Sequence, residues 1–112
     1  ASIAGGLTQE DLHVSYPEGP VRPGGAIDKL MDQFPNLYGD LSSSGAHAML
    51  RDREFGQEFL VRRADRLLFG TDYYDLTQRE FLQFSLFDAF TLPSDVQRKI
   101  SRENSQRLLG LV

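Results

Sequence analysis

Apolar residues recur along much of this chain at the spacing of an α-helix. In residues 26–33, Ile27, Leu30 and Met31 follow the i, i+3, i+4 spacing that places apolar side chains on one face of a helix. A proline that follows this segment after one residue marks its end. A longer pattern of the same kind covers residues 46–63. We therefore expect a short amphipathic helix and, further along the chain, a longer one.

The longer pattern has a polar interruption at residues 52–55, where one helix could end and the next begin. A further helix is predicted for residues 78–90, whose apolar stripe is widened by additional phenylalanines. That width indicates burial on two sides or contact with a partner. Residues 94–97 form a capping-box sequence that opens another helix. Asn104 suits the N-cap of a last helix, which ends near Gly110.

Two short apolar runs, residues 37–41 and 66–69, are expected to be strands. Residues 1–25 are dense in proline and glycine and are expected to form a loop, whereas residues 26–112 form βα units. This alternation predicts an α/β fold with a parallel sheet. Because two strands cannot make a parallel sheet that is covered on both faces, we expect the sequence to be part of a larger α/β protein.

The composition is that of a globular domain. The chain has 112 residues, of which 40% are hydrophobic and 25% charged, and its net charge of -4 gives no basic face for nucleic acid. The sequence contains no apolar run of about 18 residues that could span a membrane and no signal-peptide pattern, so a cytoplasmic protein is expected. Because the first residue is Ala1 rather than methionine, we expect the chain to be processed or cut from a longer one.

The metal-binding capacity of the sequence is small. Cysteine is absent, so strong metal ligands can come only from histidine, aspartate and glutamate. The two histidines, His13 and His47, are too few for a self-sufficient zinc site.

The segment 66–72 is the strongest candidate for chemistry. Its apolar run ends abruptly in Gly70, Thr71 and Asp72, as a buried strand does when it delivers one carboxylate to the mouth of a site. That carboxylate is a metal ligand, a proton acceptor or a helix cap, and the run alone does not distinguish these roles.

Three further side chains are candidates for contacting a substrate. Asp40 ends the first predicted strand, and His47 and Arg51 lie early in the helix that follows it. The alternatives are an exposed histidine at a helix start and an arginine paired with a neighbouring carboxylate. The basic cluster within residues 62–66 is interpreted as a solvated face.

Four segments together resemble a known family. Residues 34–42, 51–55, 65–72 and 103–111 are similar, in this order, to the C-terminal part of the amidohydrolase-related metal-dependent hydrolases, a branch that includes decarboxylases and lactonases. The resemblance extends over about residues 20–112. It implies a (β/α)8 barrel with its site at the carboxyl ends of the strands.

By this resemblance, residues 37–41 match strand seven, residues 66–70 match strand eight, and Asp72 matches the aspartate that binds a divalent metal or takes a proton from water. The metal expected in the complete enzyme is zinc, and the substrate a small carboxylated or cyclic molecule. The family's His-x-His ligands are missing from this sequence. We therefore expect the chain alone to bind no metal and to be inactive.

A non-catalytic function is the alternative. The chain could be a small α/β interaction module that self-associates, or pairs with a partner chain, through the phenylalanine-rich segment 78–90. The open edges of a two-stranded sheet would also favour a homo-oligomer.

Overall fold

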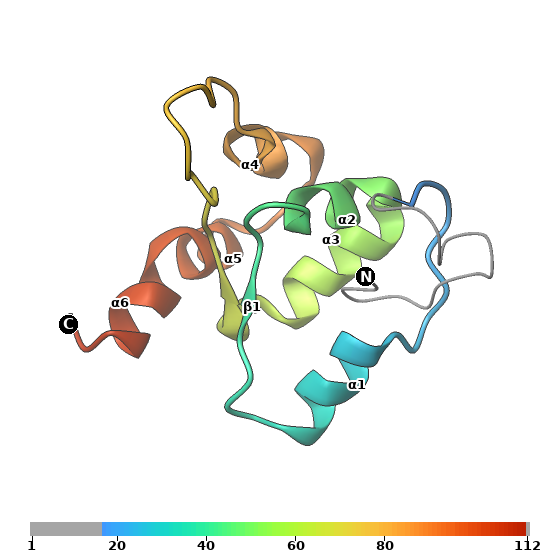
Figure 1. Ribbon diagram of the computed structural model, residues 1–112. Helices are drawn as coiled ribbons and strands as arrows, with labels where there is room; N and C mark the ends of the chain where they lie inside the picture. The colour runs from blue at the N-terminus through green and yellow to red at the C-terminus, as the bar shows by residue number, and fades with distance from the viewer. Residues whose placement is uncertain (1–16, 112) are drawn as a thin grey trace.

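The computed structural model of the chain describes residues 17–111, in which short helices surround a small parallel sheet (Figure 1). The first half contains α1 (Ala26–Gln33), β1 (Gly39–Asp40), α2 (Gly45–Arg51), α3 (Arg53–Arg62), the 3-10 turn η2 (Ala64–Arg66) and β2 (Leu67–Leu68). The second half contains α4 (Leu82–Ser85), η3 (Leu86–Ala89), α5 (Ser94–Arg98), the π-helical turn η4 (Lys99–Glu103) and α6 (Asn104–Leu108).

The two strands confirm the α/β class. Strand β1 pairs in parallel with β2, with Gly39 opposite Leu67 and Asp40 opposite Leu68. The N–H of Leu41 donates to Leu68 O at 2.9 Å and extends the ladder by one bond. Both strands are shorter than the apolar runs that predicted them. In Figure 1, α2 and α3 lie on one side of the strands and α5 and α6 on the other.

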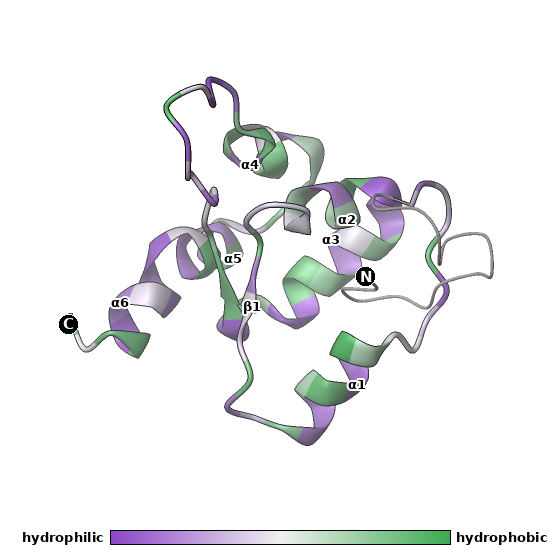
Figure 2. Cartoon of the chain, viewed as in Figure 1, coloured by the Kyte–Doolittle hydropathy of each residue, from purple (hydrophilic) through white to green (hydrophobic). Residues whose placement is uncertain are grey.

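Helix α1 has the bounds that the apolar spacing predicts, and Figure 2 shows both apolar and polar patches on it. Its buried side chain, Met31, joins the core, whose other members come from both halves of the chain. The buried apolar residues are Met31, Leu41, Ala46, Met49, Phe59, Leu60, Ala64, Leu67, Leu86, Leu92, Val96 and Ile100.

The predicted break in the second helix is confirmed at Asp52. This residue lies between α2 and α3, and its carboxylate accepts the Phe55 N–H at 3.1 Å and the Val21 N–H at 2.9 Å. These backbone donors, first Val21 and then Phe55, lower the pKa of Asp52. The two helices meet closely beyond this turn, because a Cβ placed at Gly56 would lie 2.2 Å from Met49 O. Only glycine fits there.

The helix predicted for residues 78–90 is shorter than its apolar pattern suggests. Helix α4 begins at Leu82 and passes into the 3-10 turn η3 after one turn, whereas residues 78–80 lie in the loop that follows β2. Its apolar side chains also differ in burial, since Leu86 is buried and Phe84 is 70% exposed. The stripe is therefore not one continuous core surface.

Both predicted capping positions near the C-terminus are wrong. Helix α5 has Pro93 rather than Ser94 at its N-cap, and the Gln97 N–H donates to Pro93 O at 3.2 Å. Asn104 does not begin a separate helix, because α5, η4 and α6 run continuously and Asn104 is fully buried. The predicted end of the helix is confirmed, since Gly110 takes the left-handed conformation (φ 68°) in which a helix terminates.

The π-helical turn connects this helix to β2. The Asn104 N–H donates to Lys99 O, a five-residue step, and the carbonyl of Ile100 accepts the Phe69 N–H at 3.0 Å. The Asn104 side chain donates to Ala64 O at 2.6 Å and to Leu67 O at 2.8 Å. The helix thus holds β2 just before the segment that ends in Asp72.

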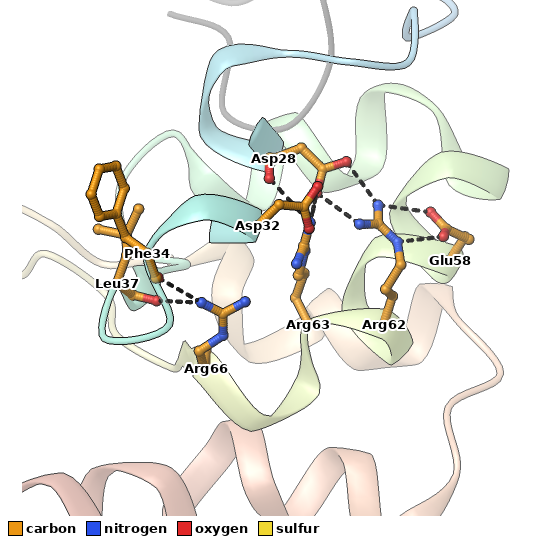
Figure 3. Close-up of polar contacts among 8 residues, drawn as sticks. All are labelled: Asp28, Asp32, Phe34, Leu37, Glu58, Arg62, Arg63 and Arg66. Carbon is orange, nitrogen blue, oxygen red and sulfur yellow. Dashed lines mark hydrogen bonds and ion pairs between the residues drawn. The ribbon is translucent and has the colours of Figure 1, made fainter. Parts of the chain in front are cut away.

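Arg63 ties the end of α3 to α1 (Figure 3). Its side chain is 7% exposed, and its Nε donates to Asp28 Oδ1 at 3.0 Å. Its Nη2 also donates to Asp32 Oδ1 at 2.6 Å and to the backbone carbonyl of Asp28 at 3.1 Å. The interpretation of the basic cluster as a solvated face is therefore wrong for Arg63.

Neighbouring arginines strengthen the same junction. Arg62 makes two hydrogen bonds to the Asp28 carboxylate, at 2.8 and 2.9 Å, and two to the Glu58 carboxylate, at 2.6 and 3.3 Å. Arg66 donates to Phe34 O at 2.9 Å, just beyond the end of α1. The basic cluster fixes α1 to α3, because each of these arginines has a partner about 30 residues away in the sequence.

Acid should weaken this junction. The hydrogen bonds from Arg62 lower the pKa of Asp28 more than its burial raises it, and Arg63 lowers it further. Because the folded-state pKa lies below the unfolded value, the stabilisation is complete above about pH 4 and is lost as the pH falls through the folded-state pKa. We expect the free energy of unfolding, measured by urea denaturation, to fall steeply below about pH 4.

Asp28→Asn should make that fall shallower, whereas Asp88→Asn, at an exposed carboxyl on η3, should not. Equal acid sensitivity in the wild-type chain and Asp28→Asn would show that other carboxyls cause the loss.

Candidate active site at the carboxyl ends of the strands

The segments that follow the two strands lie against each other. Because β1 and β2 are parallel, Asp40 at the end of β1 and Gly70 beyond β2 lie at the same edge of the sheet. A Cβ at Gly70 would lie 3.0 Å from Asp40 Oδ1 and 3.3 Å from the Ser42 Cβ. Glycine at this position allows the segment leading to Asp72 to pass close to the segment after β1.

Each of these two segments contains a non-glycine residue in the left-handed region, Ser43 with φ 50° and Asp72 with φ 59°. Aspartate tolerates this conformation better than most residues. Asp40 shapes the first segment, because its Oδ1 accepts the Ser42 N–H at 2.8 Å. Asp72 itself is exposed and follows β2 at the position that the sequence predicts for a site carboxylate.

A cavity of about 270 Å³ lies between the loop after β1, the start of α2, the loop after β2 and α4. Two of the predicted site residues, Asp72 and His47, line this cavity and face it from different elements. Its lining consists of Ser43, His47, Thr71, Asp72, Tyr74, Gln78, Glu80, Phe81, Leu82 and Gln83.

The other two predicted residues lie beside this cavity rather than in its lining. Arg51 lies one turn after His47 on α2, and both border a second hollow of about 350 Å³. Its Nε donates to Gly19 O at 2.8 Å, so Arg51 holds the segment that precedes α1. Asp40 supports the turn at Ser42, as described above. His13 lies outside the residues that the structure describes.

Gln83 is a cavity residue that the sequence analysis missed. It is 4% exposed, and its Nε2 donates to Ser43 O at 2.9 Å and to Leu41 O at 3.5 Å. It therefore fixes the loop after β1 to α4. Its spacing in the sequence could have revealed this role. Gln83 lies three residues before Leu86, so the two side chains lie on the same face of a helix, and Leu86 is buried.

Aromatic contacts position the loop after β2. The ring of Tyr73 lies 5.8 Å from that of Phe81, Phe81 lies 5.8 Å from Phe84, and Phe84 lies 5.8 Å from Phe69. Phe69 lies at the start of this loop and Phe81 at its end, and both rings contact Phe84 on α4. The row of rings therefore joins both ends of the loop to α4. Such aromatic pairs contribute about 0.5–1.5 kcal/mol each beyond burial, which helps to hold the cavity wall in place.

The donor groups at this edge of the sheet limit its capacity to bind a metal. Within residues 17–111, no three His, Cys, Asp or Glu side chains come together in a group that could hold a metal ion. Asp72 offers one carboxylate, whereas metal sites of this chemistry use three or more protein ligands. The residues described here therefore do not form a complete metal site by themselves.

A comparison with protein families identifies the family of the chain. A family described as amidohydrolase matches residues 23–111, a range that includes β1, β2, Asp72 and the helices from α1 to α6. The chain belongs to the amidohydrolase family. No curated protein and no solved structure matches the chain.

Amidohydrolase membership implies a metal-dependent hydrolase or decarboxylase type of function and a TIM-barrel fold. It gives no support to the alternative of a non-catalytic interaction module, and self-association stays a prediction. None of the helices in the described range is long and apolar enough to cross a membrane.

Proposed function

We propose that this amidohydrolase chain forms strands seven and eight of a (β/α)8 barrel with their helices. Two observations support this assignment. The strands are parallel neighbours joined by a helical crossover, which is the repeating unit of such a barrel. The candidate site lies at their carboxyl ends, where barrel enzymes have their active sites. Under this proposal, the remaining strands supply the other site residues.

We further propose that the complete enzyme hydrolyses or decarboxylates a small carboxylated or cyclic substrate, with Asp72 as the metal-binding or proton-accepting carboxylate. The observation that carries this role is the position of Asp72, which lies four residues after the end of β2 and lines the same cavity as His47 on α2. A divalent metal, with zinc as the first candidate, would polarise the substrate or lower the pKa of bound water toward about 7.

The residues of this chain would act around that centre. The Asp72 carboxylate accepts a proton from the attacking water, for which an exposed carboxylate in a cavity is suited. His47 contacts the substrate from α2, and Arg51 contacts it where the second hollow adjoins His47. Asp40 keeps the loop after β1 in place through its bond to the Ser42 N–H.

Asp72→Asn tests the proposed ligand role. The substitution keeps the size of the side chain but replaces a carboxylate oxygen with an amide that binds divalent metals poorly. In the protein that contains the whole barrel, we expect the dissociation constant for Zn²⁺ to rise by about 100-fold or more. Loss of a residue that only hydrogen-bonds to a metal ligand already lowers metal affinity by about 10–100-fold. Competition with a chromophoric chelator measures the change.

Asp75→Asn is the matched control. Asp75 lies three residues further along the same loop, where its Oδ1 accepts the Thr77 N–H at 2.7 Å, a bond that asparagine can also accept. This variant should bind Zn²⁺ as the wild type does. Unchanged metal affinity in Asp72→Asn would rule out Asp72 as a ligand.

A further inference from the structure

The orientation of the Gln83 amide is fixed by its partners. Its nitrogen faces two backbone carbonyl oxygens, those of Ser43 and Leu41. A carbonyl oxygen accepts hydrogen bonds and cannot donate one, so the NH₂ group must lie on this side. The Oε1 of Gln83 must therefore lie on the other side of the amide.

That oxygen has no hydrogen-bond partner among the described residues, although Gln83 is 4% exposed. Within residues 17–111, every completely buried side-chain nitrogen or oxygen has a hydrogen-bond partner. The Gln83 Oε1 must therefore be reached by solvent. Because Gln83 lines the cavity that contains Asp72, we infer that this oxygen is an acceptor presented in the cavity wall.

The surrounding lining has the same polarity. Asp72 and Glu80 add carboxylates, and none of the described residues around the cavity is a lysine or arginine. An anionic group held beside Gln83 would face these acceptors, with no lysine or arginine among the lining residues of this chain to compensate its charge. Tyr74 and Phe81 supply aromatic surface against which a ring can pack.

We propose that the cavity binds a single-ring substrate that donates a hydroxyl or amine hydrogen bond to the Gln83 Oε1. A volume of about 270 Å³ is sufficient for such a ring, since a cavity of about 150 Å³ can bind benzene. This assignment rests on the proposed function in taking the cavity as the substrate site. Of the two substrate classes in the proposed function, it favours a cyclic substrate that carries a hydrogen-bond donor. Any carboxylate of that substrate would lie away from Gln83.

Three simple probes test this polarity on the 112-residue chain. Phenol has a ring and a donor, anisole has the same ring with an ether oxygen that cannot donate, and benzoate carries an anion. Titrations are followed by the NMR shifts of the backbone amides, in buffer containing EDTA. We expect phenol to shift the amides of Ser43, Thr71 and Asp72, and to bind about five-fold more tightly than anisole, the effect of one hydrogen bond. Benzoate should bind more weakly than phenol.

Gln83→Met and Gln78→Met complete the experiment. Methionine keeps the length of glutamine without its acceptor, so Gln83→Met should bring the affinities for phenol and anisole together. Gln78 lines the same cavity, but its Oε1 already accepts the Tyr74 N–H at 2.8 Å and the Asp75 N–H at 3.3 Å. Gln78→Met should therefore keep the five-fold preference for phenol.

Equal binding of phenol and anisole by the wild-type chain would overturn the proposal, as would tightest binding of benzoate or shifts confined to other parts of the chain. A preference for phenol that survives in Gln83→Met would also overturn it. The wild-type comparison decides the question even if Gln83→Met does not fold. Since no metal takes part, failure here leaves the zinc result for Asp72→Asn unaffected, and the two proposals can fail separately.

Discussion

Asn104→Asp should destabilise the fold by about 3–5 kcal/mol at neutral pH, because it places a carboxylate where two carbonyl oxygens need donors. The Asn104 side chain is fully buried, and its Nδ2 donates to Ala64 O and to Leu67 O. Aspartate has the same shape but loses both donors when it is ionised. Its single partner of opposite charge would be Arg107, which donates to the Asn104 Oδ1 at 3.1 Å. Urea denaturation of both proteins measures the difference in unfolding free energy.

The loss should depend on pH in a defined direction. Burial and the two carbonyls raise the folded-state pKa of the new carboxyl above its unfolded value of about 3.9. The variant is therefore least impaired, relative to the wild type, below about pH 4, where the protonated carboxyl can donate one hydrogen bond. The difference grows as the pH rises through the folded-state pKa.

Asn36→Asp makes the same chemical change in an exposed turn after α1, and should alter stability by less than about 0.5 kcal/mol. A similarly small effect of Asn104→Asp would mean that the two carbonyls find other donors. The junction matters for the candidate site because β2 leads directly to Gly70 and Asp72. The segment 103–111, which resembles the family at the sequence level, thus holds the strand that precedes the proposed catalytic carboxylate.

Local patterns predicted most of the elements. The bounds of α1 follow from its apolar spacing and the proline beyond its end. The break at Asp52 and the order of β1 and β2 were also predicted, because a capping side chain and an apolar run act within a few residues of themselves. Asp72 was found as a candidate for the same reason, since it ends such a run.

Features that depend on distant partners could not be predicted in this way. Asn104 looked like an N-cap because asparagine is common there, but its actual partners lie about 40 residues earlier in the chain. Arg63 looked like a solvated residue for lack of a visible partner. Gln83 was hidden among phenylalanines, although a glutamine on a buried face must find hydrogen bonds across the fold.

Arg63→Met should cost about 2–3 kcal/mol of unfolding free energy at pH 7. Methionine replaces the stem of the arginine but removes the donors to Asp28 and Asp32. Breaking a buried ion pair typically costs about 3–5 kcal/mol, and the expected loss is smaller because Arg62 continues to compensate the Asp28 carboxylate. Urea denaturation at neutral pH measures the loss, and weaker docking of α1 should accompany it.

Arg62→Met is the matched control, since both arginines bind the same carboxylate but differ in burial. Arg62 is 36% exposed and Arg63 is 7% exposed, so Arg62→Met should cost only about 0–1 kcal/mol at pH 7. The two variants are expected in the opposite order for acid sensitivity, because the hydrogen bonds from Arg62 contribute most to the lowered pKa of Asp28. Arg62→Met should therefore reduce the acid sensitivity of the fold more than Arg63→Met does. Equal losses at pH 7 would mean that net charge, rather than burial of Arg63, stabilises the contact between α1 and α3.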